Sequence, residues 1–181
     1  MPDNPPSWQP NLSWITEQLA VGGSFPSAQA GCLARDHGVG AVVDLREEDR
    51  DDEGLLQTHG IAWLHLPTPD MCGVEPARLD QGVAFVCGQL ERGRRVLVHC
   101  EHGIGRSATL ALCVMVSCGE APLDALERMK QRRAVVSPSP AQFACWSAWL
   151  ARHAAKHRPD WEAPDLLAFQ AIAYRDLRGA R

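Results

Sequence analysis

The sequence predicts an α/β fold in which a central, mostly parallel β-sheet is flanked by helices on both sides. Three apolar runs, Val39–Leu45, Ile61–Leu66 and Arg95–His99, have the composition of buried strands. Segments with helical periodicity lie between and after these runs, and strands that alternate with helices favour a parallel sheet. The chain has 181 residues, of which 45% are hydrophobic, enough for one domain with a real core.

The first third of the chain is expected to build one side of this sheet. Residues 1–10 contain four prolines and are predicted to form an extended N-terminal arm. Ile15 and Leu19–Val21 predict short strands at the sheet edge, and Ser27–His37 is predicted to form a helix. Val39–Leu45 follows as a buried strand, because it is rich in β-branched residues and flanked by glycine.

A charged run separates this strand from the next. Arg46–Glu53 carries six acidic residues and two arginines, and we expect a solvated loop or the start of a helix there. Ile61–Leu66 is the next strand. Pro67–Asp70 should then leave the strand as a rigid loop, since two of its four residues are proline.

The remaining elements are mostly helical. Pro76 is placed where a helix tolerates proline, and apolar residues from Leu79 to Leu90 share one face. Ala108–Cys118 is apolar on every side, which is typical of a helix buried within a domain. Two amphipathic helices are expected after it, one from Pro122 to the basic run at 130–133 and one marked by Phe143, Trp146 and Leu150.

The domain organisation follows from these elements. We expect a catalytic domain over residues 11–153, followed by a linker and an amphipathic helix within residues 154–181. Leu166, Phe169, Ile172 and Leu177 give that helix its apolar face. Docking on the body of the same chain is the first expectation, so the protein is expected to be a monomer. A dimer contact through this helix is the alternative.

Charge and cysteine content exclude several classes of function. A formal net charge of −4 argues against generic binding to nucleic acid or to an anionic membrane. No apolar run approaches the ~20 residues of a membrane span, and the N-terminus lacks a secretory signal. The seven cysteines form no CxxC pair, which disfavours a disulfide framework and a zinc site. We therefore expect a cytoplasmic protein with no metal or cofactor.

One segment carries the chemistry. His99-Cys100-Glu101-His102-Gly103-Ile104-Gly105-Arg106-Ser107 connects a strand to a buried helix. The two glycines allow the loop amides to converge on an anion, and the N-terminus of the helix adds its dipole. A cysteine in this place should have a lowered thiol pKa, and Arg106 offers a planar fork for a tetrahedral anion. These groups predict attack of a thiolate on phosphorus.

The chain resembles the cysteine-dependent protein phosphatases, whose signature is HCxxGxxR[ST], and in particular the small atypical dual-specificity phosphatases. The resemblance extends from about Asn11 to Leu150. It includes Pro10–Trp14, Val42–Leu45, the Pro-Asp loop, the signature, and a glutamine after the turn at 137–140. It implies a dual-specificity phosphatase fold and hydrolysis of phosphomonoesters on phosphorylated proteins, without a cofactor.

The resemblance also implies a role for each site residue. Cys100 would be the nucleophile, Asp70 the general acid and then the base, and Ser107 a hydrogen-bond donor to the leaving sulfur. His99 would order the loop, and Gln142 would position the hydrolytic water. The phosphate would be bound by the arginine side chain and by the backbone of Glu101, His102, Gly103, Ile104, Gly105 and Arg106.

Several alternatives stay open. The chain is alternatively a silent phosphate-binding module, or a phosphatase for a phosphoinositide, nucleotide or sugar. An arsenate reductase or a rhodanese-type sulfurtransferase uses a similar loop. Cys72 is a candidate redox partner of Cys100, and the other five cysteines are expected to be core residues. The arginines near residues 92–95 and the basic run 130–133 could give the active-site face a local positive field.

Overall fold

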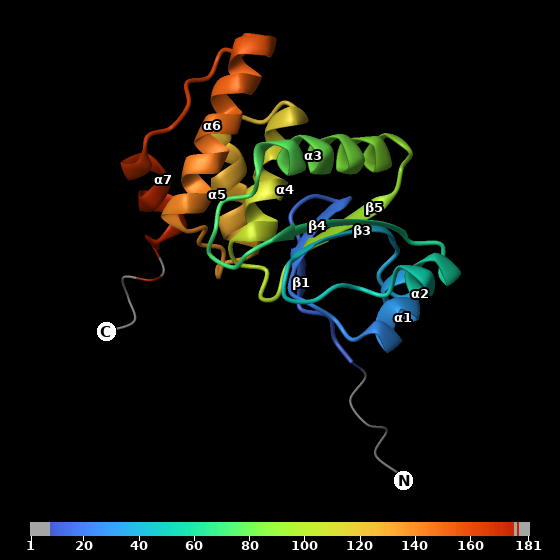
Figure 1. Ribbon diagram of the computed structural model, residues 1–181. Coiled ribbons are helices and arrows are strands. Elements are labelled where there is room, and N and C mark those ends of the chain that lie inside the picture. The colour runs from blue at the N-terminus through green and yellow to red at the C-terminus, as the bar shows by residue number, and fades with distance from the viewer. Residues whose placement is uncertain (1–7, 176, 178–181) are drawn as a thin grey trace.

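The computed structural model describes residues 8–175 and 177, and the described chain folds around one five-stranded sheet (Figure 1). The strand order is β1-β2-β5-β3-β4. β1 pairs with β2 antiparallel, and all other neighbours are parallel. The predicted α/β class with a mostly parallel sheet is therefore confirmed. The strands are β1 Leu12–Trp14, β2 Leu19–Gly22, β3 Val39–Arg46, β4 Ala62–Thr68 and β5 Arg95–His99.

Helices cover both faces of the sheet, as expected (Figure 1). A short helical turn η1 (Ser27–Gln29), α1 (Ala30–Arg35) and α2 (Glu53–Thr58) lie on one face. No helix among the described residues is long and apolar enough to span a membrane. The other face of the sheet carries the larger helical layer. That layer comprises α3 Pro76–Glu91, α4 Arg106–Ser117, α5 Pro122–Arg132 and α6 Pro140–His157, with α7 Leu166–Ala173 packed beside α5.

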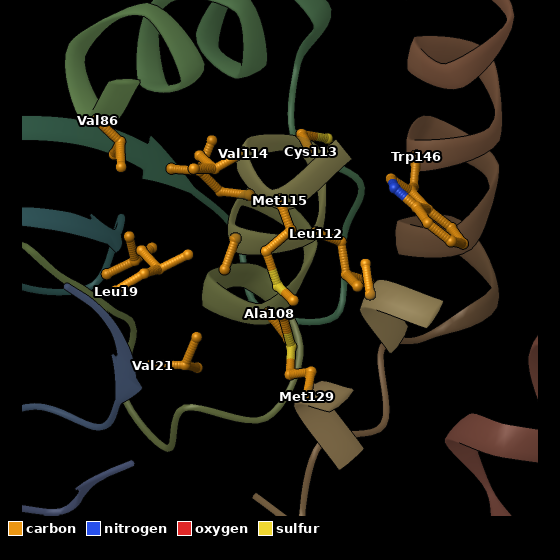
Figure 2. Close-up of a cluster of buried hydrophobic side chains, with 14 of the residues drawn as sticks. Leu19, Val21, Val86, Ala108, Leu112, Cys113, Val114, Met115, Met129 and Trp146 are labelled. Carbon is orange, nitrogen blue, oxygen red and sulfur yellow. The ribbon is translucent and has the colours of Figure 1, made fainter. Parts of the chain in front are cut away.

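The core is centred on α4, which is buried over nearly its whole length between the sheet and the other helices. Figure 2 shows Leu112 and Met115 of α4 among side chains of β2, α3, α5 and α6. This explains why Ala108–Cys118 is apolar on every side: the helix has no face toward water. Because α4 begins at Arg106, its burial also fixes the place of the preceding loop.

Two expectations about the strands are wrong. β2 is an interior strand, since it pairs with both β1 and β5, and β1 takes the edge. Leu19–Gly22 is buried throughout, so its apolar character reflects an interior position. β4 continues through Pro67 to Thr68. Because β4 is the other edge strand, a proline near its end is tolerated there.

The charged run after β3 is not simply a solvated loop. Arg46 and Asp51 are buried, although Glu47, Glu48, Asp49 and Arg50 are exposed. Asp52 caps α2 by accepting from the Leu55 amide, so the second half of the run does start a helix. Composition did not predict the burial of Arg46 and Asp51. Charged residues are seldom buried unless they are paired, and the composition of a segment does not show which of its residues will be paired.

The basic run at the end of α5 is also placed differently from the expectation. Lys130 is buried and donates to the carbonyls of Ala134 and Val136, while Arg133 is buried against the loop after β5. These two cations therefore bind backbone carbonyls, whereas Arg132 of the same run is exposed.

The C-terminal segment packs on the body of the chain. α6 continues past residue 153 to His157, and α7 follows after a connection. Phe169 and Ala173 of α7 are fully buried, and the Tyr174 hydroxyl donates to the Pro138 carbonyl. The Phe169 ring lies 4.7 Å from the Phe143 ring and 5.9 Å from the Trp146 ring, measured between centroids. The expected docked helix is thus present, but Leu166 and Leu177, which were expected on its apolar face, are exposed, and Leu177 lies beyond the end of α7.

We predict that Phe169→Ala lowers the free energy of unfolding by about 3 kcal/mol, because it leaves a cavity among three aromatic rings. Urea unfolding followed by tryptophan fluorescence measures this loss. Leu167→Ala, on the exposed side of the same helix, is the control and should cost less than about 0.5 kcal/mol. Equal effects of the two substitutions would contradict the docking of α7.

Candidate active site

The loop from Cys100 to Gly105 connects the end of β5 to the start of α4. Gly103 has a φ of 68°, a left-handed conformation that a side chain disfavours. This turn directs the Gly103 amide toward the Cys100 sulfur, with a nitrogen–sulfur distance of 3.3 Å. The Ser107 hydroxyl lies 3.4 Å from the same sulfur. The expected nest of donors is therefore formed around Cys100.

These donors stabilise a thiolate. Cys100 is only 3% exposed, and burial by itself raises the pKa of its thiol. Hydrogen bonds from the Ser107 side chain and from the backbone of Ser107, Gly103 and Ile104 outweigh that effect, so the pKa is lowered from its ordinary value. These hydrogen bonds thus favour the thiolate form of Cys100 in a nearly closed site.

Arg106 occupies the other side of the same site. Its guanidinium is 1% exposed and donates to both carboxylate oxygens of Glu48 at 2.7 Å. It also donates to the Thr68 carbonyl at 2.9 Å and lies 3.3 Å from Asp70. Its Nε is buried and has no hydrogen-bond partner among the described residues, which leaves one donor for an oxygen of a bound anion.

Glu48 belongs to the site although the sequence did not single it out. Its hydrogen bonds to Arg106 lower the pKa of its carboxyl to about 2, so it is ionised at neutral pH. The residue follows β3 within the charged run, and no motif marked it. The contact between Glu48 and Arg106 depends on the packing of β3 beside β5, which brings the segments that follow these two strands together.

Asp70 lies where the sequence predicted it, on the loop that follows β4. Its side chain is 65% exposed and reaches Arg106, so the acid and the loop arginine share one site. The next residue, Met71, has a φ of 60° without being glycine. The Ser139 hydroxyl donates to the Met71 carbonyl at 2.7 Å and ties this acid loop to the start of α6.

Gln142 is buried, not a surface residue. It forms a capping box with Ser139: the Gln142 side chain accepts from the Ser139 amide, and Ser139 Oγ accepts from the Gln142 amide. A side chain at Gly105 would collide with the Gln142 amide group, so the glutamine lies directly against the loop after β5. Gln142 therefore stabilises the start of α6, and its role in positioning water stays a prediction.

Arg133 holds the outer side of the loop. It donates to the carbonyls of Gly103 at 2.7 Å and His102 at 2.9 Å, and to the side chains of Asn11 and Ser13. Pinning carbonyls on the outside leaves the loop amides free to face inward. This role of Arg133 was not predicted, because a basic helix end is usually solvated.

A buried ionic cluster lies behind the loop. Asp44, Arg46, Asp51 and His99 are each at most 4% exposed. His99 Nε2 lies 2.7 Å from Asp51, and Arg46 donates to both Asp44 and Asp51. The Asp44, Asp51 and His99 ligand atoms lie within 4.8 Å of one another, but the Arg46 guanidinium already binds both carboxylates. The sequence predicted that His99 orders the loop, but it did not predict that His99 pairs with Asp51 in a buried cluster.

The other cysteines differ in burial: Cys72 and Cys118 are exposed, and Cys32, Cys87 and Cys145, which were expected in the core, are only half-buried. Cys113 is buried, as expected, and burial raises its thiol pKa. Cys118 is exposed at the end of α4, so the expectation of a core residue is wrong there. A hydrogen bond with Cys87 lowers the pKa of Cys118 to about 7. Cys72 is exposed on the acid loop, and its pairing with Cys100 stays a prediction.

Comparison with known proteins identifies the family of this chain. Residues 9–177 match the model of the Swiss Army Knife protein, DSP-PTPase phosphatase domain. The chain belongs to this family. The predicted resemblance to small dual-specificity phosphatases is therefore confirmed, and the match covers nearly all of the chain.

Two curated relatives illustrate how similar this phosphatase domain is to individual proteins. It is 40% identical over 89 residues to mouse dual specificity protein phosphatase 2, covering 48% of this chain and 26% of that protein. It is 32% identical over 119 residues to rat phosphatidylglycerophosphatase and protein-tyrosine phosphatase 1, covering 61% of each. The chain thus spans only part of the length of these relatives.

Solved structures agree on the fold. The active form of Tk-PTP superposes with a TM-score of 0.72 at 25% identity, over 80% of this chain and 99% of that one. PTPMT1 in complex with PI(5)P gives a TM-score of 0.73 at 23% identity, over 78% of this chain and 96% of that one.

We predict that Ser107→Ala raises the pKa of the Cys100 thiol by about one to two units, since a hydrogen bond to a charged group contributes ~1.5–3 kcal/mol. The pH dependence of Cys100 alkylation by iodoacetamide measures it. Ser117→Ala, at the opposite end of α4, is the control and should leave the midpoint unchanged. An unchanged midpoint in Ser107→Ala would show that the hydroxyl does not stabilise the thiolate.

Proposed function

We propose that this phosphatase domain hydrolyses phosphomonoesters through a cysteinyl-phosphate intermediate. The convergence of Cys100, Arg106 and Asp70 at one end of the sheet is the observation that supports it. The thiolate supplies the nucleophile, and Arg106 with the loop amides supplies the positive charge. The mechanism therefore needs neither a metal nor a cofactor.

In the first step, the Cys100 thiolate attacks phosphorus in line with the leaving oxygen. A sulfur–phosphorus bond forms as the phosphorus–oxygen bond breaks, and protonated Asp70 gives its proton to the departing oxygen. The unpartnered Nε of Arg106 and the inward-facing amides bind the equatorial oxygens, where charge is spread in the transition state.

In the second step, a water molecule replaces the alcohol. Asp70, now a carboxylate, takes a proton from the water as its oxygen attacks phosphorus, and the sulfur–phosphorus bond breaks. The Ser107 hydroxyl donates to the departing sulfur, and Gln142, which lies against Gly105, is proposed to orient the water. Inorganic phosphate leaves and the thiolate is restored.

For the substrate, we propose phosphorylated protein side chains, including phosphotyrosine. Three exposed apolar side chains, Met71, Ile104 and Val135, belong to segments that meet at the site: Ser139 holds the Met71 carbonyl, and the Ser137 amide donates to the Ile104 carbonyl. An apolar rim suits the residues beside a phosphorylated side chain.

The ionised groups at the site also favour a substrate of low charge. Glu48 and Glu101 are partly exposed beside the loop. Their two carboxylates repel a polyanionic headgroup more than a single phosphomonoester. This is the physical reason for placing phosphoproteins ahead of inositol lipids.

A lipid phosphate is the second candidate. One relative is named a phosphatidylglycerophosphatase as well as a protein-tyrosine phosphatase, and PTPMT1 was solved with PI(5)P. A panel of phosphopeptides, phosphoinositides and nucleotide phosphates separates the candidates. A kcat/KM for phosphatidylinositol phosphates above that for every phosphopeptide would overturn our order.

The compartment, the oligomeric state and the bounds of the catalytic domain are also proposals. We propose a cytoplasmic monomer, because the cysteines are free thiols and the apolar face of α7 is packed on its own chain. We also propose that residues 11–153 carry the catalytic machinery, with the N-terminal arm and the C-terminal segment as additions. Light scattering at micromolar concentration tests the monomer.

We predict that Cys100→Ser abolishes hydrolysis of p-nitrophenyl phosphate, because an alcohol at this place is not ionised. Rapid acid quenching with a ³²P-labelled substrate should trap phosphate on the native protein and none on the variant. Vanadate binding should persist in the variant, since its amides and Arg106 are intact. Normal turnover by Cys100→Ser would overturn the nucleophile assignment.

We predict that Asp70→Asn lowers kcat for an alkyl phosphate by ~100-fold or more, and much less for p-nitrophenyl phosphate, whose leaving group needs little protonation. The basic limb of the kcat profile should disappear with it. Asp80→Asn on α3 removes an equally exposed carboxylate and serves as the control. Equal losses on both substrates would point to another acid.

A further inference from the structure

The ionic cluster behind the catalytic loop is not used by the mechanism above. It joins three segments: β3 supplies Asp44 and Arg46, the loop after β3 supplies Asp51, and the end of β5 supplies His99. Arg46 binds Asp44 at 2.9 and 3.0 Å and Asp51 at 2.8 Å. A buried charge costs several kcal/mol unless it is paired, so such a cluster calls for an explanation.

The environment of the His99 ring defines its protonation. Nδ1 lies 3.2 Å from the Cys100 carbonyl oxygen, and Nε2 lies 2.7 Å from Asp51 Oδ2. A carbonyl and a carboxylate only accept hydrogen bonds, so both ring nitrogens must carry a proton. The hydrogen bonds are therefore those of an imidazolium.

The charges in the cluster balance on this basis. Two carboxylates, Asp44 and Asp51, face two cations, Arg46 and His99. Burial lowers the pKa of His99, and the hydrogen bond and charge of Asp51 outweigh that effect, so the pKa lies above its ordinary value. Asp44 does not replace Asp51 here, since it lies 3.9 Å from Nε2 and is bound to Arg46.

The Cys100 carbonyl links this cluster to catalysis. In a planar, trans peptide the carbonyl and the following N–H point in opposite directions. Holding the Cys100 carbonyl on the His99 side therefore turns the Glu101 amide away from the cluster, toward the side on which the loop binds phosphate. Loss of the Nδ1–H bond would free this first peptide of the loop to rotate.

We propose that Asp51 is a positioning residue of the phosphatase: it holds His99 doubly protonated, so that the ring fixes the first peptide of the catalytic loop behind Cys100. This proposal rests on the function proposed above. Asp51 touches neither substrate nor sulfur. Through Arg46 it also anchors the loop that carries Glu48, and hence the carboxylate that holds Arg106.

The charge on His99 also bears on the thiolate. A cation fixed next to Cys100 in a buried region favours the ionised thiol. The Ser107 hydroxyl and the loop amides bind the sulfur, and the charges of Arg106 and Arg133 also act on it. None of these groups touches Asp51, so a change at Asp51 reaches the sulfur through His99 or, less directly, through Arg46, Glu48 and Arg106.

Asp51→Asn tests the proposal, with Asp49→Asn as the matched control. Both changes remove one carboxylate of the same loop that binds Arg46, but Asp49 is exposed and has no contact with His99. We expect Asp51→Asn to raise the midpoint of Cys100 alkylation by about one pH unit, and to lower kcat/KM below that midpoint about tenfold. Asp49→Asn should change neither.

Two features keep this test decisive. Alkylation reports on Cys100 whether or not a substrate is turned over, so it is separable from failure of the proposed function. If both variants titrate alike while remaining folded by circular dichroism, Asp51 has no positioning role and the proposal is overturned.

A measurement on the unaltered protein covers the case in which Asp51→Asn does not fold. ¹⁵N NMR of ring-labelled histidine, assigned with His99→Gln, distinguishes an imidazolium from a neutral ring. We expect both nitrogens of His99 to be protonated at pH 7.5, above the ordinary midpoint of ~6.5. A single protonated nitrogen at that pH would overturn the proposal.

Discussion

A buried thiolate is stable only if donors surround it, and most of the site can be understood from that constraint. The amides near Gly103 and the Ser107 hydroxyl face the sulfur, so the carbonyls of the same loop must face outward. Arg133 binds two of those carbonyls, and His99 binds a third. Charged residues far apart in sequence are therefore needed to shape one loop of the backbone.

Local signals predicted the parts of the molecule that depend on local structure. The run Arg95–His99, the glycine-containing loop and the apolar helix after it form one strand–loop–helix unit, and the sequence of that unit defines its structure. Asp70 was predicted from the family resemblance, which places a general acid on the loop after the preceding strand. The position of that loop is itself local, since it follows directly from the end of β4.

The roles that escaped prediction depend on contacts between distant segments. Glu48, Asp51 and Arg133 sit in charged runs, and nothing in such a run distinguishes the buried member from its exposed neighbours. Asp49 and Asp51 are both acidic and two positions apart, yet only Asp51 reaches His99. Which of them is buried depends on how β3, β5 and the loop after β3 are packed.

The left-handed backbone at Met71 gives the acid loop an energetic property of its own. A non-glycine residue in that conformation costs about 1–2 kcal/mol, and the exposed Met71 side chain recovers little by burial. The observed position of Asp70 is held instead by polar contacts, from Ser139 on one side and Arg106 on the other. Polar contacts exchange readily with water, whereas Val74, three residues after Met71, is buried in the hydrophobic core. The Asp70 end of this loop should therefore be easier to displace than its Val74 end.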